Sequence, residues 1–272
     1  MSNKDFQNGF ALGYASGGVV EVIDATEIDN LENLIDESGV LEDTEGSVSE
    51  KVEELIDKAE ELEIFHCLKT ISFQKTNTFP NKAVINLPNV TSLAQTFAYW
   101  NVEPIPIVEE LTITAPLVTD ISRMFLYNSG VKKVVLNLSE KCINMSSSFS
   151  ACNVGEVVLN FSTKNVTNFE RVFSHAGVLK KIVGELDLTS ATNVTLMFYR
   201  ASVLNDVAFV PNTISISISF VECSKLTSES VQSIIDGLAT VETAQTLTLN
   251  SAIVLTDEQK ATINAKGWTL AQ

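Results

Sequence analysis

Five phenylalanines recur at nearly constant spacing through the middle of this 272-residue chain, and no other feature constrains its fold as strongly. They are separated by 28, 24, 24 and 25 residues and are Phe97, Phe125, Phe149, Phe173 and Phe198. An apolar residue stands four positions before each one, and in four of the five cases a threonine stands six positions before. One such unit cannot bury its apolar side alone, so we expect the units to stack with these Phe side chains as a buried column.

Each unit also contains a short run in which apolar residues alternate, which is the pattern of a β-strand. These runs are residues 111–113, 134–138, 157–161 and 185–188. The threonine is expected to cap a short helical turn, because apolar residues four apart lie on one face of a helix. A tight turn should then precede a valine in four of the five units, at Val131, Val154, Val178 and Val203. The sequence thus predicts an α/β leucine-rich-repeat solenoid with a parallel β ladder and short helical turns, in which Leu136, Leu159 and Leu186 align.

The pattern becomes irregular at both ends of the repeats. Residues 68–73 and 84–87 are expected to form earlier, irregular strands. From about residue 226 we expect a capping repeat, because a terminal unit faces water on one side. Its predicted parts are a helix from Thr227, a strand at 246–249, a helix at 257–265 opened by a capping box of Thr256 and Gln259, a stop at Gly267, and a last strand at 268–270.

The charge is distributed very unevenly. The chain has a net charge of −16, yet residues 1–65 hold three Lys against eighteen Asp and Glu, while residues 66–272 hold 15 basic and 16 acidic residues. This asymmetry predicts an acidic N-terminal module, 1–65, and a nearly neutral repeat body, 66–272. The negative charge disfavours nucleic acid as a partner. No apolar run reaches membrane-spanning length and no signal-peptide pattern is recognised, so we expect no membrane insertion and synthesis in the cytoplasm.

The acidic module carries a heptad-like apolar seam. Its members are Ile28, Leu31, Ile35, Val48, Val52, Leu55, Ala59 and Leu62. A helix of this length is marginal alone, so the seam must either fold back on the repeat body or self-associate, as a trimer or dimer. Upstream, Phe6, Phe10 and Tyr14 recur every four residues, which predicts a short anchoring helix.

Residues for catalysis or metal binding are scarce. Cys67, Cys142, Cys152 and Cys223 form no Cys-x-x-Cys pair and are expected to be buried thiols. Adjacent His66 and Cys67 would point to opposite faces of a strand, which makes a shared metal awkward. No phosphate-binding loop or catalytic motif is recognised. We therefore predict a non-enzymatic protein without a cofactor or bound metal.

One stripe has the composition of a contact surface. Two residues after each column phenylalanine stand Tyr99, Tyr127, Ala151, His175 and Arg200, with Trp100 and Tyr199 beside them. Tyr, Trp and Arg are enriched where proteins contact partners. The alternative is that these are ordinary loop residues that cover the core.

Two resemblances bear on function. Residues 89–91, 165–173 and 193–198 resemble the Asn-Val-Thr-Asn-Met repeats of BspA-like leucine-rich repeat proteins, over roughly 68–220. That family is mostly bacterial surface proteins linked to adhesion. Residues 3–6, 45–52, 255–259 and 266–268 are similar to modules of tail or accessory virion proteins of bacteriophages that infect Gram-positive bacteria.

These resemblances imply a structural or adhesion protein. The expected form is a phage virion accessory or tail protein, with the virion as its location. Its N-terminal module would bind other virion or surface proteins and form a homo-oligomer, and its solenoid would face a host-surface glycan or protein. The alternative is a BspA-like adhesin at the bacterial cell surface.

Overall fold

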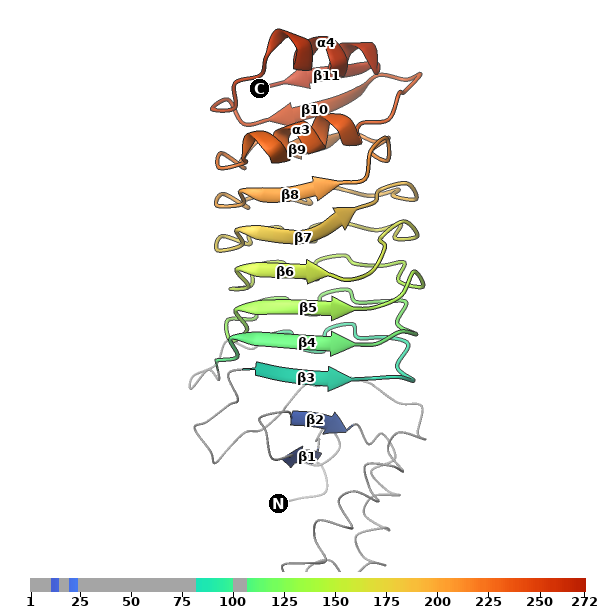
Figure 1. Ribbon diagram of the computed structural model, residues 1–272, viewed down its shortest axis with the longest axis vertical. Coiled ribbons are helices and arrows are strands. Elements are labelled where there is room, and N and C mark those ends of the chain that lie inside the picture. Colours follow the sequence, from blue (N-terminus) through green and yellow to red (C-terminus); the bar gives the residue numbers. More distant parts are fainter. Residues whose placement is uncertain (1–10, 15–19, 24–81, 100–106) are drawn as a thin grey trace, which may run out of the picture.

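The structure, a computed structural model, describes residues 11–14, 20–23, 82–99 and 107–272 (Figure 1). Most of these residues form rungs, each about one sequence repeat long, that stack along the long axis of the molecule. Each of the regular rungs contributes one strand to a six-stranded parallel sheet in the order β3-β4-β5-β6-β7-β8. Its strands are β3 (Lys82–Asn86), β4 (Glu110–Thr114), β5 (Lys133–Asn137), β6 (Glu156–Leu159), β7 (Lys181–Leu186) and β8 (Asp206–Phe209).

The strands stack because their inward side chains are apolar and in register. Ile113 of β4 pairs with Leu136 of β5, which pairs with Leu159 of β6, and all three are buried. The outward positions between them are polar or β-branched and half exposed. This is the alternation expected of a sheet with one buried face, and the repeat-like parallel architecture fits the predicted solenoid.

The predicted column of phenylalanines is confirmed. Its five rings are at most 4% exposed, and consecutive centroids lie 5.2, 5.4, 5.7 and 5.6 Å apart, with nearly parallel planes. Phe220 extends the column by stacking on Phe198 at 4.7 Å. We call this column the spine, and the layer of chain that carries it, opposite the sheet, the turn side.

The predicted helical turns around the spine are wrong. Within residues 91–99 and the equivalent part of each regular rung, the chain makes consecutive turns instead. The N–H groups of Gln95, Phe97 and Tyr99 donate to carbonyls of the next rung at 2.9, 2.8 and 2.7 Å. A helix would direct these groups along its own axis, so bonding between rungs replaces helix formation.

Threonine has a different role from the predicted N-cap. The hydroxyls of Thr119, Thr167 and Thr192 donate to carbonyls one rung earlier. The capping interaction belongs to the next residue, whose side-chain oxygen accepts from the N–H two positions on. These residues are Ser92, Asp120, Asn144, Asn168 and Asn193, and they also form a ladder of bridges between rungs.

Two finer register predictions need correction. Val178 is 42% exposed and Val203 is only half-buried, because in these two rungs the next residue, Leu179 or Leu204, takes the buried place. Leu186 pairs with Phe209 rather than directly with Leu159, because β7 contains a bulge before Glu185. Gly184 makes the bulge possible: it has φ +99°, and a Cβ there would lie 2.5 Å from the Leu159 carbonyl oxygen.

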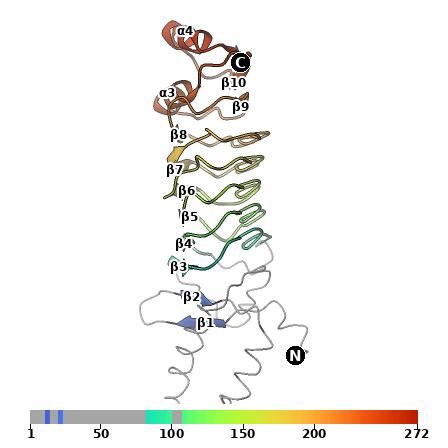
Figure 2. The same ribbon diagram turned by 90° about the vertical axis from the view of Figure 1, so that its right-hand side faces the viewer.

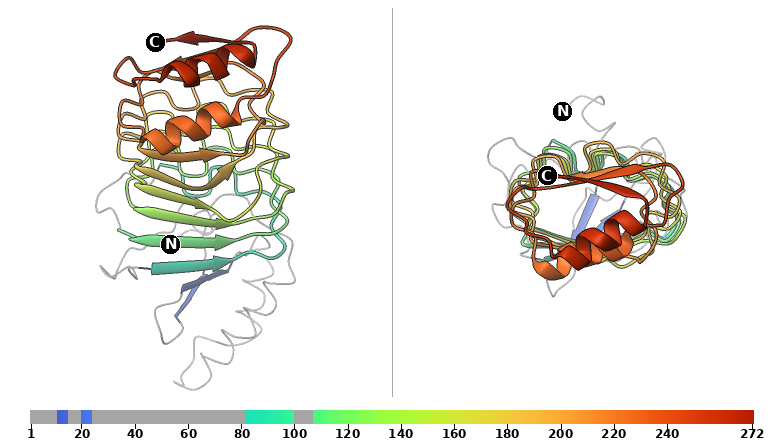
Figure 3. Two further views of the ribbon diagram at one scale, coloured as in Figure 1. Left: turned by 45° about the horizontal axis from the view of Figure 1, so that its top comes forward. Right: turned by 90° about the horizontal axis from the view of Figure 1, so that it is seen from above.

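The C-terminal rungs exchange the two layers. Helices α3 (Ser228–Gly237) and α4 (Asp257–Ala265) lie on the side of the sheet, whereas β9 (Ile218–Phe220), β10 (Gln245–Leu249) and β11 (Trp268–Ala271) continue the turn side as a parallel sheet (Figures 2 and 3). The predicted helix start at Thr227, the capping box of Thr256 and Gln259, and the stop at Gly267 are all confirmed, and Thr227 is the N-cap of α3.

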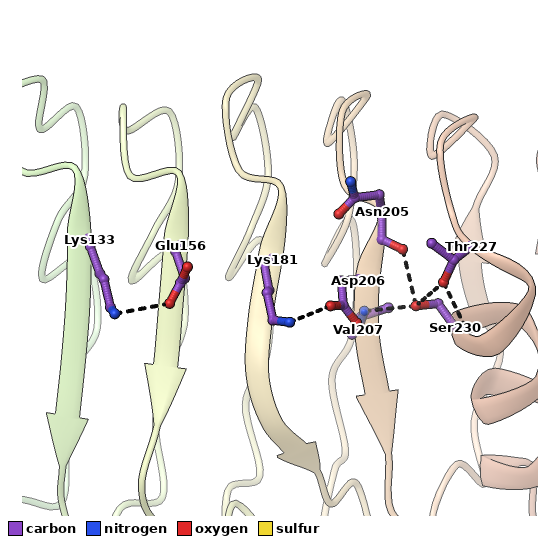
Figure 4. A network of polar contacts seen from close by, with 8 residues as sticks. All are labelled: Lys133, Glu156, Lys181, Asn205, Asp206, Val207, Thr227 and Ser230. Atoms are coloured by element: carbon purple, nitrogen blue, oxygen red, sulfur yellow. Dashed lines mark hydrogen bonds and ion pairs between the residues drawn. The ribbon is translucent and has the colours of Figure 1, made fainter.

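Helix α3 closes the edge of β8 with side-chain hydroxyls. Ser230 Oγ accepts from the N–H of Val207 at 3.0 Å and donates to the Asn205 carbonyl at 3.1 Å (Figure 4). Ser233 Oγ accepts from the N–H of Phe209 at 2.9 Å. These bonds take the place of a seventh strand, so the edge of the sheet is covered.

Near the N-terminus the described strands are β1 (Ala11–Tyr14) and β2 (Val20–Ile23), which pair antiparallel. The expected helix through Tyr14 is therefore wrong at its end. The remainder of the predicted acidic module, its boundary near Phe65 and the strand at 68–73 lie outside the described residues.

Candidate functional site

The turn side holds each exposed side chain of the predicted contact stripe in an unusual backbone conformation. Tyr99, Tyr127, Ala151, His175 and Arg200 all have positive φ, between 51° and 62°. We call them the second left-handed column. The N–H groups of the first four donate to carbonyls of the following rung, so the column is fixed to the ladder that holds the rungs together.

Tyr99 and Tyr127 form an exposed aromatic pair on adjacent rungs. Their ring centroids lie 5.7 Å apart with an interplanar angle of 28°, and the residues are 54% and 48% exposed. Stacking gives the pair a defined geometry while leaving ring area open to solvent. Trp100, predicted to lie beside it, is outside the described residues.

His175, Tyr199 and Arg200 form a second cluster further along the column. The His175 ring meets the Tyr199 ring edge-on, with centroids 5.1 Å apart, and Arg200 Cζ lies 5.3 Å from the centroid of Tyr199. Ser174 Oγ lies 3.0 Å from His175 Nδ1. The structure thus brings these three predicted residues together, and they present a cation, an imidazole and a phenol at the surface.

A further column of residues with positive φ runs beside this one and was not predicted from the sequence. Four residues before each member of the second column stands another with positive φ, and these form the first left-handed column: Gln95, Arg123, Ser147, Arg171 and Leu196. Arg123 and Arg171 are exposed, and Arg171 pairs with Glu170 at 3.1 Å. The repeat register contained this signal, because the column stands two residues before each spine phenylalanine.

The two columns contain every arginine of the chain. Arg123, Arg171 and Arg200 have φ of 55°, 53° and 58°. An L-residue with a side chain pays roughly 1 kcal/mol or more for this conformation, whereas glycine adopts it freely. None of these ten positions is glycine. Strained positions that keep large side chains point to a role for those side chains.

The described thiols have no reactive character. Burial raises the pKa of Cys142, Cys152 and Cys223 to about 12, so they stay protonated at neutral pH. All three are buried and free, as predicted, whereas Cys67 and His66 lie outside the described residues. In the part of the chain that the structure describes, no three His, Cys, Asp or Glu side chains are grouped to hold a metal ion.

The residues predicted to mediate oligomerisation are not placed. Ile28, Leu31, Ile35, Val48, Val52, Leu55, Ala59 and Leu62 all lie outside the described residues, so their association stays a prediction. Among the described helices, neither is long and apolar enough to cross a bilayer.

Together the fold and the surface define a repeat-like α/β protein with a parallel sheet and an exposed aromatic and cationic turn side. Residues 119–224, within the repeats, match the model of a family described as "Mycoplasma protein of unknown function, DUF285". No curated protein matches the chain significantly, and no solved structure does. The family match is weak support for a repeat protein.

Proposed function

We propose that this chain is a non-enzymatic BspA-like leucine-rich-repeat protein that presents its turn side to a surface glycan or protein. In this proposal it is an accessory or tail protein of a bacteriophage virion. The helices of its N-terminal module attach it to other virion proteins and make it a homo-oligomer, and the rungs hold the turn side outward.

The exposed Tyr99–Tyr127 stack is the observation that carries the proposal. A tyrosine pair with roughly half of its area in water contributes little to the core, yet both residues occupy strained left-handed positions. Aromatic and arginine side chains supply most of the energy at contact surfaces. Backbone bonds to the next rung preorganise the column, which lowers the entropic cost of binding.

A bacterial cell-surface adhesin is the second candidate. The family that matches residues 119–224 is described as a Mycoplasma protein, and Mycoplasma is a bacterium. An adhesin would use the same turn side, so the two candidates differ in where the protein resides. Mass spectrometry of purified virions from the source organism, beside its surface-protein fraction, separates them.

Binding to intact Gram-positive cells and their isolated cell walls tests the surface itself. Fluorescently labelled full-length protein should bind at least one member of a cell panel. The double variant Tyr99→Ser, Tyr127→Ser should weaken that binding at least about tenfold. Val254→Ser is the matched control, because Val254 is 91% exposed and lies outside both columns. Equal binding by the double variant would overturn the assignment of this surface.

The oligomer is tested by light scattering of the full chain. Leu55→Asp places a charge in the proposed seam and should lower the molar mass. A wild-type protein that is strictly monomeric would remove this half of the proposal.

A further inference from the structure

The exposed face of the six-stranded sheet carries charges of alternating sign. One outward side chain at the start of each strand forms a column, in the order Lys82, Glu110, Lys133, Glu156, Lys181 and Asp206. Within the column, Lys133 Nζ lies 3.2 Å from carboxylate oxygens of both Glu110 and Glu156, and Lys181 Nζ lies 2.7 Å from Asp206 (Figure 4). The six charges sum to zero.

Two further rows run beside this column. The middle row consists mainly of small or β-branched side chains, which are Val84, Thr112, Val135, Val158, Val183 and Ala208. At the bulge of β7 the exposed Glu185 pairs with Ala208, which adds one carboxylate to this row. The third row contains Asn86, Thr114, Asn137 and Asn160, in which Asn160 Nδ2 donates to Asn137 Oδ1 at 2.8 Å and Asn137 Nδ2 to Thr114 Oγ1 at 3.1 Å. None of these side chains is buried. We call the three rows together the sheet face.

We propose that the sheet face binds the sheet face of a second copy of this chain across a two-fold axis that runs parallel to the strands, between β5 and β6. This rotation reverses the order of the strands but leaves positions along each strand unchanged. Lys133 then faces Glu156 of the other copy, Glu110 faces Lys181, and Lys82 faces Asp206. Every charge of the column meets its opposite, because the column has an even number of alternating signs.

The other two rows obey the same symmetry. The middle row faces itself, with Glu185 of β7 opposite β4 of the other copy. The third row also faces itself, and each Asn in it offers both donors and an acceptor. Rotation about the stacking axis instead, with the charge columns superposed, would place Lys82 on Lys82 and Glu110 on Glu110. Like charges opposed in this way disfavour that arrangement, whereas the axis parallel to the strands pairs every charge of the column with its opposite. Charge complementarity therefore favours this isologous contact.

Existing ion pairs within the column favour this contact. Because each charge already has an opposite neighbour on its own sheet, part of its hydration is already replaced before the copies meet. The hydrogen bond from Lys133 lowers the pKa of Glu110, which keeps this carboxylate ionised well below neutral pH. The side chains of the column keep 26–73% of their area exposed, so they remain able to reach across the interface.

The size of the sheet face limits the strength of the dimer. Six strands about 4.8 Å apart and five residues of about 3.3 Å each give roughly 475 Å² per copy, or about 950 Å² for the pair. This is the low end for specific complexes. Sheet twist sets packed sheets about 30° apart, so outer strands diverge and the central pair of Lys133 and Glu156 dominates. We expect a weak dimer that dissociates as salt increases.

A charge-exchange experiment on the full chain tests the proposal. In a dimer of the Lys133→Glu variant, the new carboxylate of each copy lies opposite Glu156 of the other, which gives two like-charge pairs. In a dimer of the Glu156→Lys variant, the new ammonium group of each copy lies opposite Lys133 of the other, which again gives two like-charge pairs. Each single variant should self-associate at least about tenfold more weakly than wild type in sedimentation equilibrium. An equimolar mixture of the two variants should recover the wild-type mass, because both central pairs are complementary again in the mixed dimer.

Controls separate this contact from folding and from the N-terminal seam. Lys164→Glu makes the same charge change at an ion pair with Glu140 away from the sheet face, and it should leave association unchanged. Thermal unfolding verifies that each variant is folded. Leu55→Asp should leave the response to charge exchange intact. Equal masses for wild type and both single variants, or no gain on mixing, would overturn the proposal.

Discussion

The regular rungs and the C-terminal rungs bury a continuous apolar interior between two layers of chain, but the type of secondary structure in the two layers differs. In the regular rungs, strands form the sheet and consecutive turns carry the spine, whereas after β8 helices continue the side of the sheet and strands continue the turn side. The buried column passes through the change, because Phe220 of β9 stacks on Phe198. Continuity of the apolar interior is therefore the constraint, and the secondary structure around it is adjustable.

The largest loss of stability is expected in the spine, because the regular rungs and the C-terminal rungs both pack around it. Phe149→Ala removes a fully buried ring that stacks on Phe125 and Phe173. We expect a loss of about 3 to 5 kcal/mol in the free energy of unfolding, from lost burial and the cavity left behind. Denaturant unfolding of the full chain measures it. Tyr127→Ala is the contrasting variant, because half of that residue is exposed, and a comparable loss there would contradict the special role of the spine.

The bulge in β7 gives the next effect. Gly184→Ala would place a Cβ 2.5 Å from the Leu159 carbonyl oxygen at φ +99°. We expect a loss of about 2 to 3 kcal/mol, because backbone must move or the strand must straighten. Gly177→Ala is the matched control, since nothing lies within 4 Å of its Cβ position. Equal unfolding midpoints for the two variants would show that the bulge tolerates a side chain.

The features that were predicted correctly from the sequence depend on residues that are adjacent in the chain or that repeat at a fixed spacing. The spine follows from spacing alone, and the capping box of Thr256 and Gln259 needs only four adjacent residues. Isolated Gly184 within a strand pattern was a signal for the bulge that could have been used. In each case the residues that define the feature are close in sequence or repeat with a fixed period.

Features that depend on contacts between rungs were not predictable in the same way. Thr167 has the residue type of an N-cap, but its hydroxyl donates to the Ile143 carbonyl, 24 residues away. Arg123 and Arg171 occupy left-handed positions where glycine or asparagine would be expected from local rules. The alternating charges of the sheet face become visible only when the strands are placed in register.

The exchange of layers depends on how α3 ends the sheet. Ser230→Ala leaves the Val207 N–H and the Asn205 carbonyl without the hydroxyl that bonds both, at a site where Ser230 is 2% exposed. We expect a loss of about 1 to 3 kcal/mol, measured by denaturant unfolding. Ser228→Ala serves as the control, because Ser228 is exposed in the first turn of α3. An unchanged stability for Ser230→Ala would mean that packing alone covers the β8 edge.

The smallest expected effect is a gain in stability rather than a loss. It concerns the turn side, where the regular rungs have consecutive turns and the C-terminal rungs have strands. Ala151 is the second left-handed column's smallest member, with φ 51°. Ala151→Gly relieves the strain between its Cβ and the backbone, and this gain exceeds the greater entropy of glycine in the unfolded chain. We expect a stabilisation of about 0.5 to 1 kcal/mol, seen as a higher Tm. Ala98→Gly is the control: Ala98 has no positive φ, so only the entropic cost remains and the Tm should fall. If both variants lowered the Tm equally, the left-handed columns would store no strain, and the presence of large side chains in them would need no functional reason.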